Sequence, residues 1–503
     1  MIQRGGLSTT FASAFATVVL AGLILWGSLT IDTSSNALIT PGVVIHFVFN
    51  TLIVLVALGF SIRAHPYSMH LFHLVGLLIF GCVGGLYQYL AGNFPLAGPV
   101  MIFKKEIPIA SVAVTLWVLA YLGGYVIRTR FGPRLRAARF VRSFEKPVSV
   151  ASVHFALIVG FFSLIYLASL GLVGAFTRAA ADESLALAAS GPVYFINNIF
   201  VRALPLIAVA GTALAIRRSG SILGIGLLIP MFVFDVVGVL VTNSPFAAAR
   251  YWFVAVAVGL ASPHLLAARK TAIPVLVCLI TGLSVLPSIG AARDAQTLAE
   301  IIQYYLRIDS PFEYLATSGD VDAFGMMCLA VKWLDINGPT GGLQMLGALL
   351  FWVPRTLWPS KPVGTGAMVS DELGFDFTNL SVPIMTEPLV DFGLLGVPVV
   401  AFGFGWLLAA LDRSYWTPFD PSRSPVGFRR IDVIYPFWVG MLLFVTRGDL
   451  LSSFGYTVGI TLAMIPFVLV PARIRSRHAS EDRAIESDAG DLSPFSGSAD
   501  FRL

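Results

Sequence analysis

Four cations stand where the sequence passes between apolar and polar stretches. A charge at a lipid boundary is costly unless it has a partner. An arginine fork gives two parallel hydrogen bonds to phosphate oxygens, so several cations gathered at one membrane face would suit a pyrophosphate group. The candidates for this role are Arg250, Arg355, Lys361 and Arg447. The alternative for each is a cation that extends from a helix end toward water.

Carboxylates in the same part of the chain are candidates for proton transfer. A carboxylate in a partly desolvated cleft can take a proton from an attacking hydroxyl group. Glu387 ranks first because, with Asp391, it precedes Phe392-Gly393 at the start of an apolar run, a rigid place for a catalytic group. Asp320 and Asp322 rank second. A structural role, such as capping a helix or pairing with an arginine, is an equally good interpretation for each.

Several other chemistries are disfavoured by the residue types. None of the seven histidines lies in residues 291–391, and the chain has no HExxH, Walker or GxGxxG motif. The cysteines, Cys82, Cys278 and Cys328, have no metal-binding spacing. We therefore expect no metal, no cofactor and no nucleic-acid partner.

The elements that must position these residues are membrane helices. Of the 503 residues, 56% are hydrophobic and 12% charged, with a mean hydropathy of +0.82. A soluble domain has roughly a quarter charged residues. Recurring apolar runs of about 20 residues predict an all-α, polytopic integral membrane protein with about twelve spans. The expected spans are 11–30, 42–62, 70–91, 107–127, 147–174, 192–216, 221–242, 251–267, 272–290, 392–411, 431–446 and 455–471.

The basic residues predict the orientation of these spans. Most of the 33 lysines and arginines fall in connections on the same side as the N-terminus. By the positive-inside rule that side is cytoplasmic, and both termini lie there. The connection 291–391 then lies on the extracytoplasmic side, where its length suggests a function.

The long connection divides the chain. Apolar residues at helical spacing predict a surface helix over 298–307. The short apolar run 342–353, followed by Pro354, predicts a helix that dips into the membrane and returns. The expected parts are a membrane bundle of about nine spans at 1–290, the extracytoplasmic segment 291–391, membrane helices at 392–471 and a disordered cytoplasmic tail at 472–503.

Two charges inside expected spans face a similar depth. Arg202 and Asp235 lie in neighbouring antiparallel spans, which predicts a buried ion pair. A structural role that fixes the helix pair is favoured over a role in a site.

Three strings together resemble a known family. Pro354-Arg-Thr-Leu-Trp-Pro-Ser-Lys-Pro362, then Glu387-Pro-Leu-Val-Asp-Phe-Gly-Leu-Leu-Gly396, and later Arg447-Gly448 resemble the bacterial O-antigen and oligosaccharide repeat-unit polymerases of the Wzy type. Arg355 is followed by ten residues and Gly366, which is similar to the Arg-x10-Gly pattern of such polymerases. The resemblance is loose over the whole topology and closer over residues 320–450.

The resemblance implies an inner-membrane glycosyltransferase with a GT-C-like fold. It would transfer a growing glycan from its undecaprenyl-pyrophosphate carrier to a new lipid-linked repeat unit at the periplasmic face. Glu387 would be the base, and the four cations named above would bind pyrophosphate. The product would be a surface polysaccharide, whether the O-antigen of lipopolysaccharide, a capsule or an exopolysaccharide. The implied partners are the lipid-linked glycans, membrane lipids and a chain-length regulator.

Two other functions compete with this one. An O-antigen ligase uses the same lipid-linked polymer, but that family is expected to carry a histidine in its large periplasmic loop, which this chain lacks. A lipid-linked oligosaccharide flippase would be built from two similar halves. In this chain only the second half holds a long outer segment.

Overall fold

Helices make up the described part of the chain. The computed structural model describes residues 7–33, 36, 38–65, 67–97, 105–131, 150–169, 192–218, 222–243, 252, 255–260, 299, 303, 311–376, 380–416 and 429–465. The helices are α1 (Leu7–Thr30), α2 (Pro41–Ala64), α3 (Met69–Gly76), the π-helical η1 (Leu77–Val83), α4 (Gly84–Ala91), α5 (Glu106–Phe131), α7 (Val150–Ser169), α10 (Pro192–Arg218), α11 (Ile222–Thr242), α15 (Pro311–Thr317), the 3-10 turn η2 (Gly319–Val321), α16 (Ala323–Asn337), α17 (Leu343–Leu349), α18 (Thr365–Glu372), α19 (Thr386–Phe392), the 3-10 turn η3 (Gly393–Leu395), α20 (Gly396–Trp416), α21 (Arg430–Arg447) and α22 (Leu450–Leu462).

Many of these helices are apolar enough to lie in a membrane. Those long enough to cross it are Pro41–Ile62, Met69–Ala91, Glu106–Phe131 and Thr386–Trp416. Shorter apolar helices are Thr17–Thr30, Ser152–Ile165, Val201–Ile216, Leu228–Thr242 and Leu450–Leu462. Each expected span that falls in the described residues coincides with a helix, and 251–267 and 272–290 lie largely or wholly outside them. The all-helical fold is thus confirmed for the described residues, and the apolar helices are consistent with a membrane protein, while the count of about twelve spans and their orientation stay predictions.

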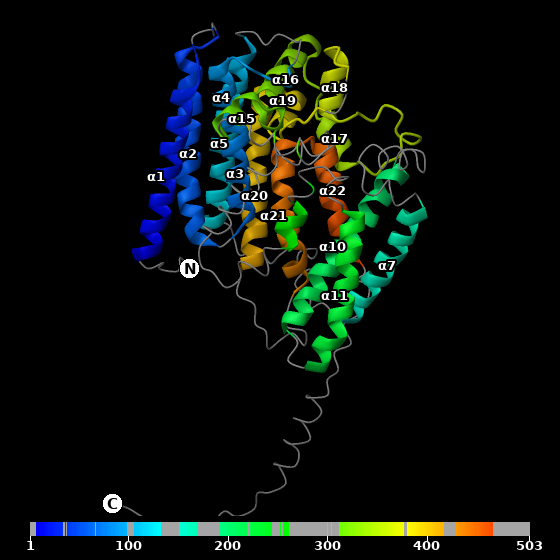
Figure 1. The fold of residues 1–503 in the computed structure, drawn as a ribbon. Helices are drawn as coiled ribbons and strands as arrows, with labels where there is room; N and C mark the ends of the chain where they lie inside the picture. Colours follow the sequence, from blue (N-terminus) through cyan, green and yellow to red (C-terminus); the bar gives the residue numbers. More distant parts are fainter. Residues whose placement is uncertain are drawn as a thin grey trace, which may run out of the picture.

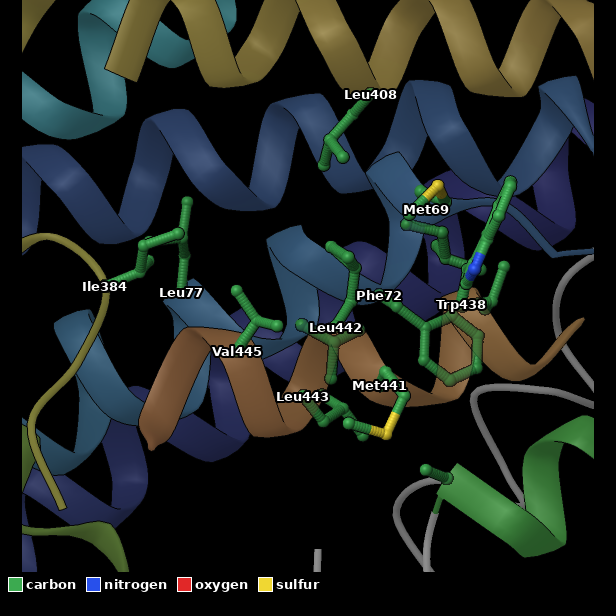
Figure 2. Close-up of a cluster of buried hydrophobic side chains, with 14 of the residues drawn as sticks. Met69, Phe72, Leu77, Ile384, Leu408, Trp438, Met441, Leu442, Leu443 and Val445 are labelled. Carbon is green, nitrogen blue, oxygen red and sulfur yellow. The ribbon is translucent and has the colours of Figure 1, made fainter. Parts of the chain in front are cut away.

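One continuous helical segment, Met69–Ala91, is buried inside the bundle. α3, η1 and α4 follow one another without a break, and nearly all of their side chains are buried. A helix that is apolar all round belongs inside a bundle, because every face needs an apolar neighbour. Figure 2 shows Met69 and Phe72 of α3 beside Met441 and Leu442 of α21. This packing connects the N-terminal helices to those that follow the outer segment.

Two glycines allow α5 and α20 to approach closely. A Cβ atom on Gly124 of α5 would overlap the carbonyl oxygen of Phe402, and one on Gly405 of α20 would overlap that of Tyr121. Small residues are typical of membrane helix contacts, where close backbone packing replaces the hydrophobic effect. α19, which contains Glu387, leads through η3 into the start of α20, so this contact fixes the helix that follows the candidate base.

A buried carboxylate, that of Asp412, lies at the N-terminus of α3. Asp412 of α20 is 2% exposed. It accepts hydrogen bonds from the backbone N–H groups of Met69 (2.9 Å) and His70 (3.1 Å) and from the hydroxyl groups of Tyr435 (2.6 Å) and Tyr125 (3.0 Å). It therefore caps α3, because the first N–H groups of a helix have no partner within the helix. The sequence analysis assigned no role to it.

The predicted ion pair between Arg202 and Asp235 is wrong. The Asp235 carboxylate accepts a hydrogen bond from Thr212 Oγ1 at 3.0 Å, and no ion pair joins it to Arg202 in the described residues. The reason is the register of α10 against α11. Asn243 at the end of α11 donates to the Arg202 carbonyl oxygen, and Asp235 lies eight residues earlier on the helix. At 1.5 Å per residue, that places Asp235 about 12 Å deeper than Arg202.

The part of the long connection that is described forms a small folded layer at one end of the bundle. Figure 1 shows α15, α16, α18 and α19 together at the top of the molecule. Met326, Leu329 and Trp333 of α16 form a separate core with Val369 of α18 and Val390 of α19. The described part of the connection therefore has a core of its own.

Two further predictions concerned helices within this connection, one that dips into the membrane and one that lies on its surface. The apolar run 342–353 forms the short helix α17, which ends at Leu349 and is followed by turns. Its entry into the membrane stays a prediction. The surface helix expected at 298–307 and the tail 472–503 lie outside the described residues, apart from isolated positions.

Candidate functional site

In the turn after α17, the side chains of Arg355 and Lys361 donate hydrogen bonds to carbonyl oxygens of the same turn. Lys361 is 9% exposed, and its Nζ donates to the carbonyl oxygens of Phe351 (2.5 Å) and Val353 (3.0 Å). Arg355 donates from Nη1 to the Lys361 carbonyl oxygen at 2.6 Å and from Nη2 to that of Pro362 at 3.4 Å. Burial, with the nearby Arg355 charge, lowers the pKa of Lys361. The two predicted cations are thus brought together, with Arg355 exposed on the surface.

Gly366, the glycine of the Arg-x10-Gly pattern, has a steric reason to be glycine. A Cβ atom there would overlap the carbonyl oxygen of Leu380. The first turn of α18 therefore lies directly on the strand-like stretch that leads to α19. This contact places Thr365 next to Glu387.

Glu387 is buried and held by two donors. Its side chain is 2% exposed. Oε2 accepts from Thr365 Oγ1 at 2.6 Å, and Oε1 accepts from the Leu450 N–H at 3.2 Å. Because the donors come from α18 and α22, three elements distant in the sequence fix this one carboxylate.

Asp449 is the second carboxylate at this position. It is the N-cap of α22 and accepts from the Ser452 N–H at 3.4 Å through Oδ2. A Cβ atom on Gly364 would overlap the same carboxylate, so Gly364 leaves room for it. Among the described residues, Asp449 Oδ1 is buried and has no hydrogen-bond partner. An unsatisfied buried oxygen costs free energy, so it calls for an explanation.

These residues line one narrow pocket. Its walls come from α17, the turn before α18, α19 and the start of α22. The pocket contains about 170 Å³ not occupied by protein atoms, open solvent included, and admits no water-sized sphere. The lining residues are Gln344, Gly347, Ala348, Pro362, Val363, Gly364, Thr365, Glu387, Asp449 and Leu451.

The other candidate acids have structural partners. Asp391 accepts from the N–H groups of Gln344 (3.0 Å) and Met345 (2.9 Å) and so caps α17. Asp322 caps α16 through the Gly325 N–H at 2.9 Å. Asp320 accepts from the Tyr314 hydroxyl at 2.8 Å. None of these three lines the pocket.

Arg447 is buried and bonded to the backbone near the site. It is 3% exposed, and each of its guanidinium nitrogens donates to a backbone carbonyl. Nε reaches Asp320 at 2.9 Å, Nη1 reaches Ser381 at 2.9 Å, and Nη2 reaches Gly319 at 2.8 Å. The guanidinium thus joins the end of α21 to two parts of the connection 291–391. These partners differ from the pyrophosphate that the sequence assigned to it.

The structure brings together some of the predicted site and adds to it. Glu387 lies in the pocket, Pro362 directly after Lys361 lines it while Arg355 and Lys361 do not, and Arg250 lies outside the described residues. Sequence reasoning missed Asp449 and Thr365. Asp449 did carry a signal, since an aspartate at the start of an apolar run is a helix N-cap pattern. Thr365 carried none.

Metal sites and known relatives give no further assignment. Within the described ranges, no group of three or more histidine, cysteine, aspartate or glutamate side chains is placed to hold a metal ion. Comparisons with protein-family models, curated proteins and solved structures produce no match.

Proposed function

We propose that the chain is a membrane glycosyltransferase that joins undecaprenyl-pyrophosphate-linked oligosaccharide repeat units into a surface polysaccharide. The observation that carries the proposal is a convergence. Of the strings that are similar to the Wzy-type polymerases, 354–362 contributes Pro362 and 387–396 contributes Glu387 to one pocket, and Asp449, which directly follows the string 447–448, lines it as well. They are separated by tens of residues in the sequence, so their meeting is a property of the fold.

Glu387 has the surroundings of a general base. It is shielded from water, and its oxygens are oriented by Thr365 and Leu450. In the proposed reaction the terminal hydroxyl of one glycan attacks the anomeric carbon of another and forms the new glycosidic bond. The bond from that carbon to the pyrophosphate oxygen breaks with its electron pair, and Glu387 receives the hydroxyl proton.

The leaving pyrophosphate needs positive charge at the mouth of the pocket. Arg355 is exposed and bonded to the carbonyl oxygen of Pro362, a residue that lines the pocket, and it forms hydrogen bonds only to carbonyl oxygens of its own turn in the described structure. These neutral contacts are weaker than the charge-assisted bonds that a pyrophosphate would offer. Lys361 lies beside it and adds a second charge. In this proposal Arg447 does not bind the pyrophosphate. Its hydrogen bonds instead hold the end of α21 against Gly319, Asp320 and Ser381.

The helix α17 has two faces that fit a substrate with a polar head and an apolar tail. Its pocket face consists of Gln344, Gly347 and Ala348. Its outer face exposes leucines at a spacing of three residues, Leu343, Leu346 and Leu349, which are 49%, 43% and 55% exposed. Such a face is stable against hydrocarbon and costly against water. It supports the expectation that α17 lies at the lipid boundary.

The proposal is tested by Glu387→Gln in a bacterial strain that depends on this chain for its polysaccharide. We expect polymer ladders to disappear and single repeat units to accumulate on the outer surface. Glu372→Gln is the matched control, because Glu372 is exposed on α18, away from the pocket. Single units stalled on the inner side would instead indicate a flippase. Intact free polymer that fails to reach lipid A core would indicate a ligase.

A further inference from the structure

The pocket encloses two carboxylates whose charges no cation balances directly. Among the described residues, the recorded ion pairs are Lys105–Asp335 and Arg429–Asp432, and neither involves Glu387 or Asp449. Leu450, the residue after Asp449, donates its N–H to Glu387, so the two carboxylates belong to one hydrogen-bonded turn at the start of α22.

The charged groups around this pair are all engaged elsewhere. On α19, Asp391 caps α17. At the end of α21, Arg447 donates to carbonyl oxygens of the outer segment. In the turn before α18, Lys361 donates to carbonyl oxygens and Arg355 does the same. The pocket residues of α17 and α18, Gln344 and Thr365, do not titrate.

Two ionised carboxylates are unstable in such a space. Like charges at close range in a low-dielectric pocket strongly favour the state in which one of them is protonated. The pocket that both carboxylates line is narrow and admits no water-sized sphere. Asp449 Oδ1 is the buried oxygen without a partner, and a proton on it would turn an orphan acceptor into a donor.

We propose that Glu387 and Asp449 share one proton, which is held on Asp449 Oδ1 and donated toward Glu387. Asp449 is then a positioning residue, because it keeps Glu387 ionised and aligned while the pair as a whole carries one negative charge. This role rests on the proposed function, whereas the shared proton itself does not. In the reaction, the pair would pass from one proton to two when Glu387 takes the hydroxyl proton.

The surroundings of Asp449 agree with a proton on it. Burial raises the pKa of Asp449, and backbone N–H groups that include those of Ser452 and Gly366 oppose the rise. As the pH falls, the second proton would bind and remove the base. The acid limb of the activity profile would therefore report the pair.

Infrared difference spectroscopy of the purified full-length protein tests the shared proton without any assay of activity. We expect the wild-type-minus-variant spectra of Glu387→Gln and Asp449→Asn at pH 7 each to contain one protonated-acid carbonyl band. The double variant should lose no more than either single variant. Asp335→Asn is the control, since its exposed carboxylate pairs with Lys105 and should contribute no such band.

Several outcomes would overturn the proposal. No protonated-acid band in either difference spectrum would show that both carboxylates are ionised. Two bands that add up in the double variant would show two independent acids. Asp449→Asn and Asp449→Ser both keep an N-cap acceptor for α22, so a folding defect in one variant leaves the other for measurement.

The same variants separate this inference from the proposed function. In a polymerisation assay, Asp449→Asn should move the acid limb of the rate to higher pH, because the carboxyl O–H that stabilises ionised Glu387 would be replaced by a weaker amide donor. If the infrared result holds but no glycan is polymerised, the pair stands and the proposed function fails. If polymerisation is confirmed but the shared band is absent, the function stands and the pair fails.

Discussion

Asp322 uses one carboxylate to join two parts of the outer layer. It is fully buried and accepts from the N–H groups of Leu96 (2.7 Å) and Gly325 (2.9 Å), so it connects the α4–α5 turn to the start of α16. Burial raises its pKa to about 6, although both N–H groups and the charge of Arg447 oppose the rise. An aspartate in an unfolded chain has a pKa of about 3.9.

A pH-dependent loss of stability follows from this carboxylate. Between those two pKa values the folded state holds the proton more tightly than the unfolded state, so Asp322 makes stability fall as pH rises from about 4 through about 6. Asp322→Asn removes the titration. We expect the free energy of unfolding of the variant, measured relative to that of the wild type, to rise by about 3 kcal/mol as the pH rises through that window. Thermal unfolding of both proteins in one detergent, from pH 4 to pH 7, measures this, and a gap independent of pH would contradict it.

Arg355 is the cation that the structure leaves best placed for a substrate. Arg355→Ala should lower the polymerisation rate about a hundredfold or more, because one electrostatic donor to a developing charge is typically worth about 2.7–4 kcal/mol. Arg355→Lys keeps the charge without the fork and should recover only part of the rate. Polymer ladders of wild-type length and amount from the alanine variant would remove Arg355 from the site.

At this scale, residue types predicted the kind of group but not its partners. Glu387 was identifiable because it stands at the start of an apolar run, a rigid place for a catalytic group. The positions of Arg447 and Asp449 in the sequence do not show that the first donates to carbonyl oxygens and that the second lies beside Glu387. Both facts depend on how α21 and α22 meet the outer segment.

At the scale of elements, the contact between α5 and α20 makes a matched comparison possible. Gly405→Ala should destabilise the protein by about 1–3 kcal/mol, because its Cβ atom would overlap the Tyr121 carbonyl oxygen and force the helices apart. Gly403→Ala, two residues earlier on the same helix, meets nothing within 4 Å and should have little effect. Thermal unfolding measures both, and equal effects would show that the close approach is unimportant.

The helices themselves were predictable, since a membrane requires about 20 apolar residues for each crossing. Their register was not. Arg202 and Asp235 looked level when depth was counted from the helix ends, whereas the observed contact of Arg202 with Asn243 displaces them along the axis. Hydropathy shows where a span begins and ends, and side-chain packing decides how two spans slide against each other.

At the scale of the whole molecule, the distribution of basic residues predicts which face is outside. Asp335 is an exposed residue of the outer layer, and Phe131 is 77% exposed at the far end of α5. We expect an impermeant maleimide to label Asp335→Cys in cells with an opened outer membrane, and to label Phe131→Cys only after the inner membrane is permeabilised. Cys82 and Cys328 are buried and should stay unlabelled.

The opposite labelling pattern would invert the orientation, and labelling of both positions in intact cells would contradict a spanning α5. The side of the membrane stays a prediction from charge alone. The pocket could not be predicted, because it forms from segments that hydropathy treats as loops.

The contacts of Arg447 bear on the order in which the chain is assembled during synthesis. Its guanidinium reaches carbonyl oxygens of residues that were made 66 to 128 positions earlier. At roughly 5–20 residues per second, Gly319 and Asp320 leave the ribosome on the order of ten seconds before the donor that satisfies them exists. Leu450, which orients Glu387, emerges later still. The folded layer can therefore complete its contacts only after the last helices are made. A chain truncated before them would lack Asp449 and Leu450, and with them part of the pocket.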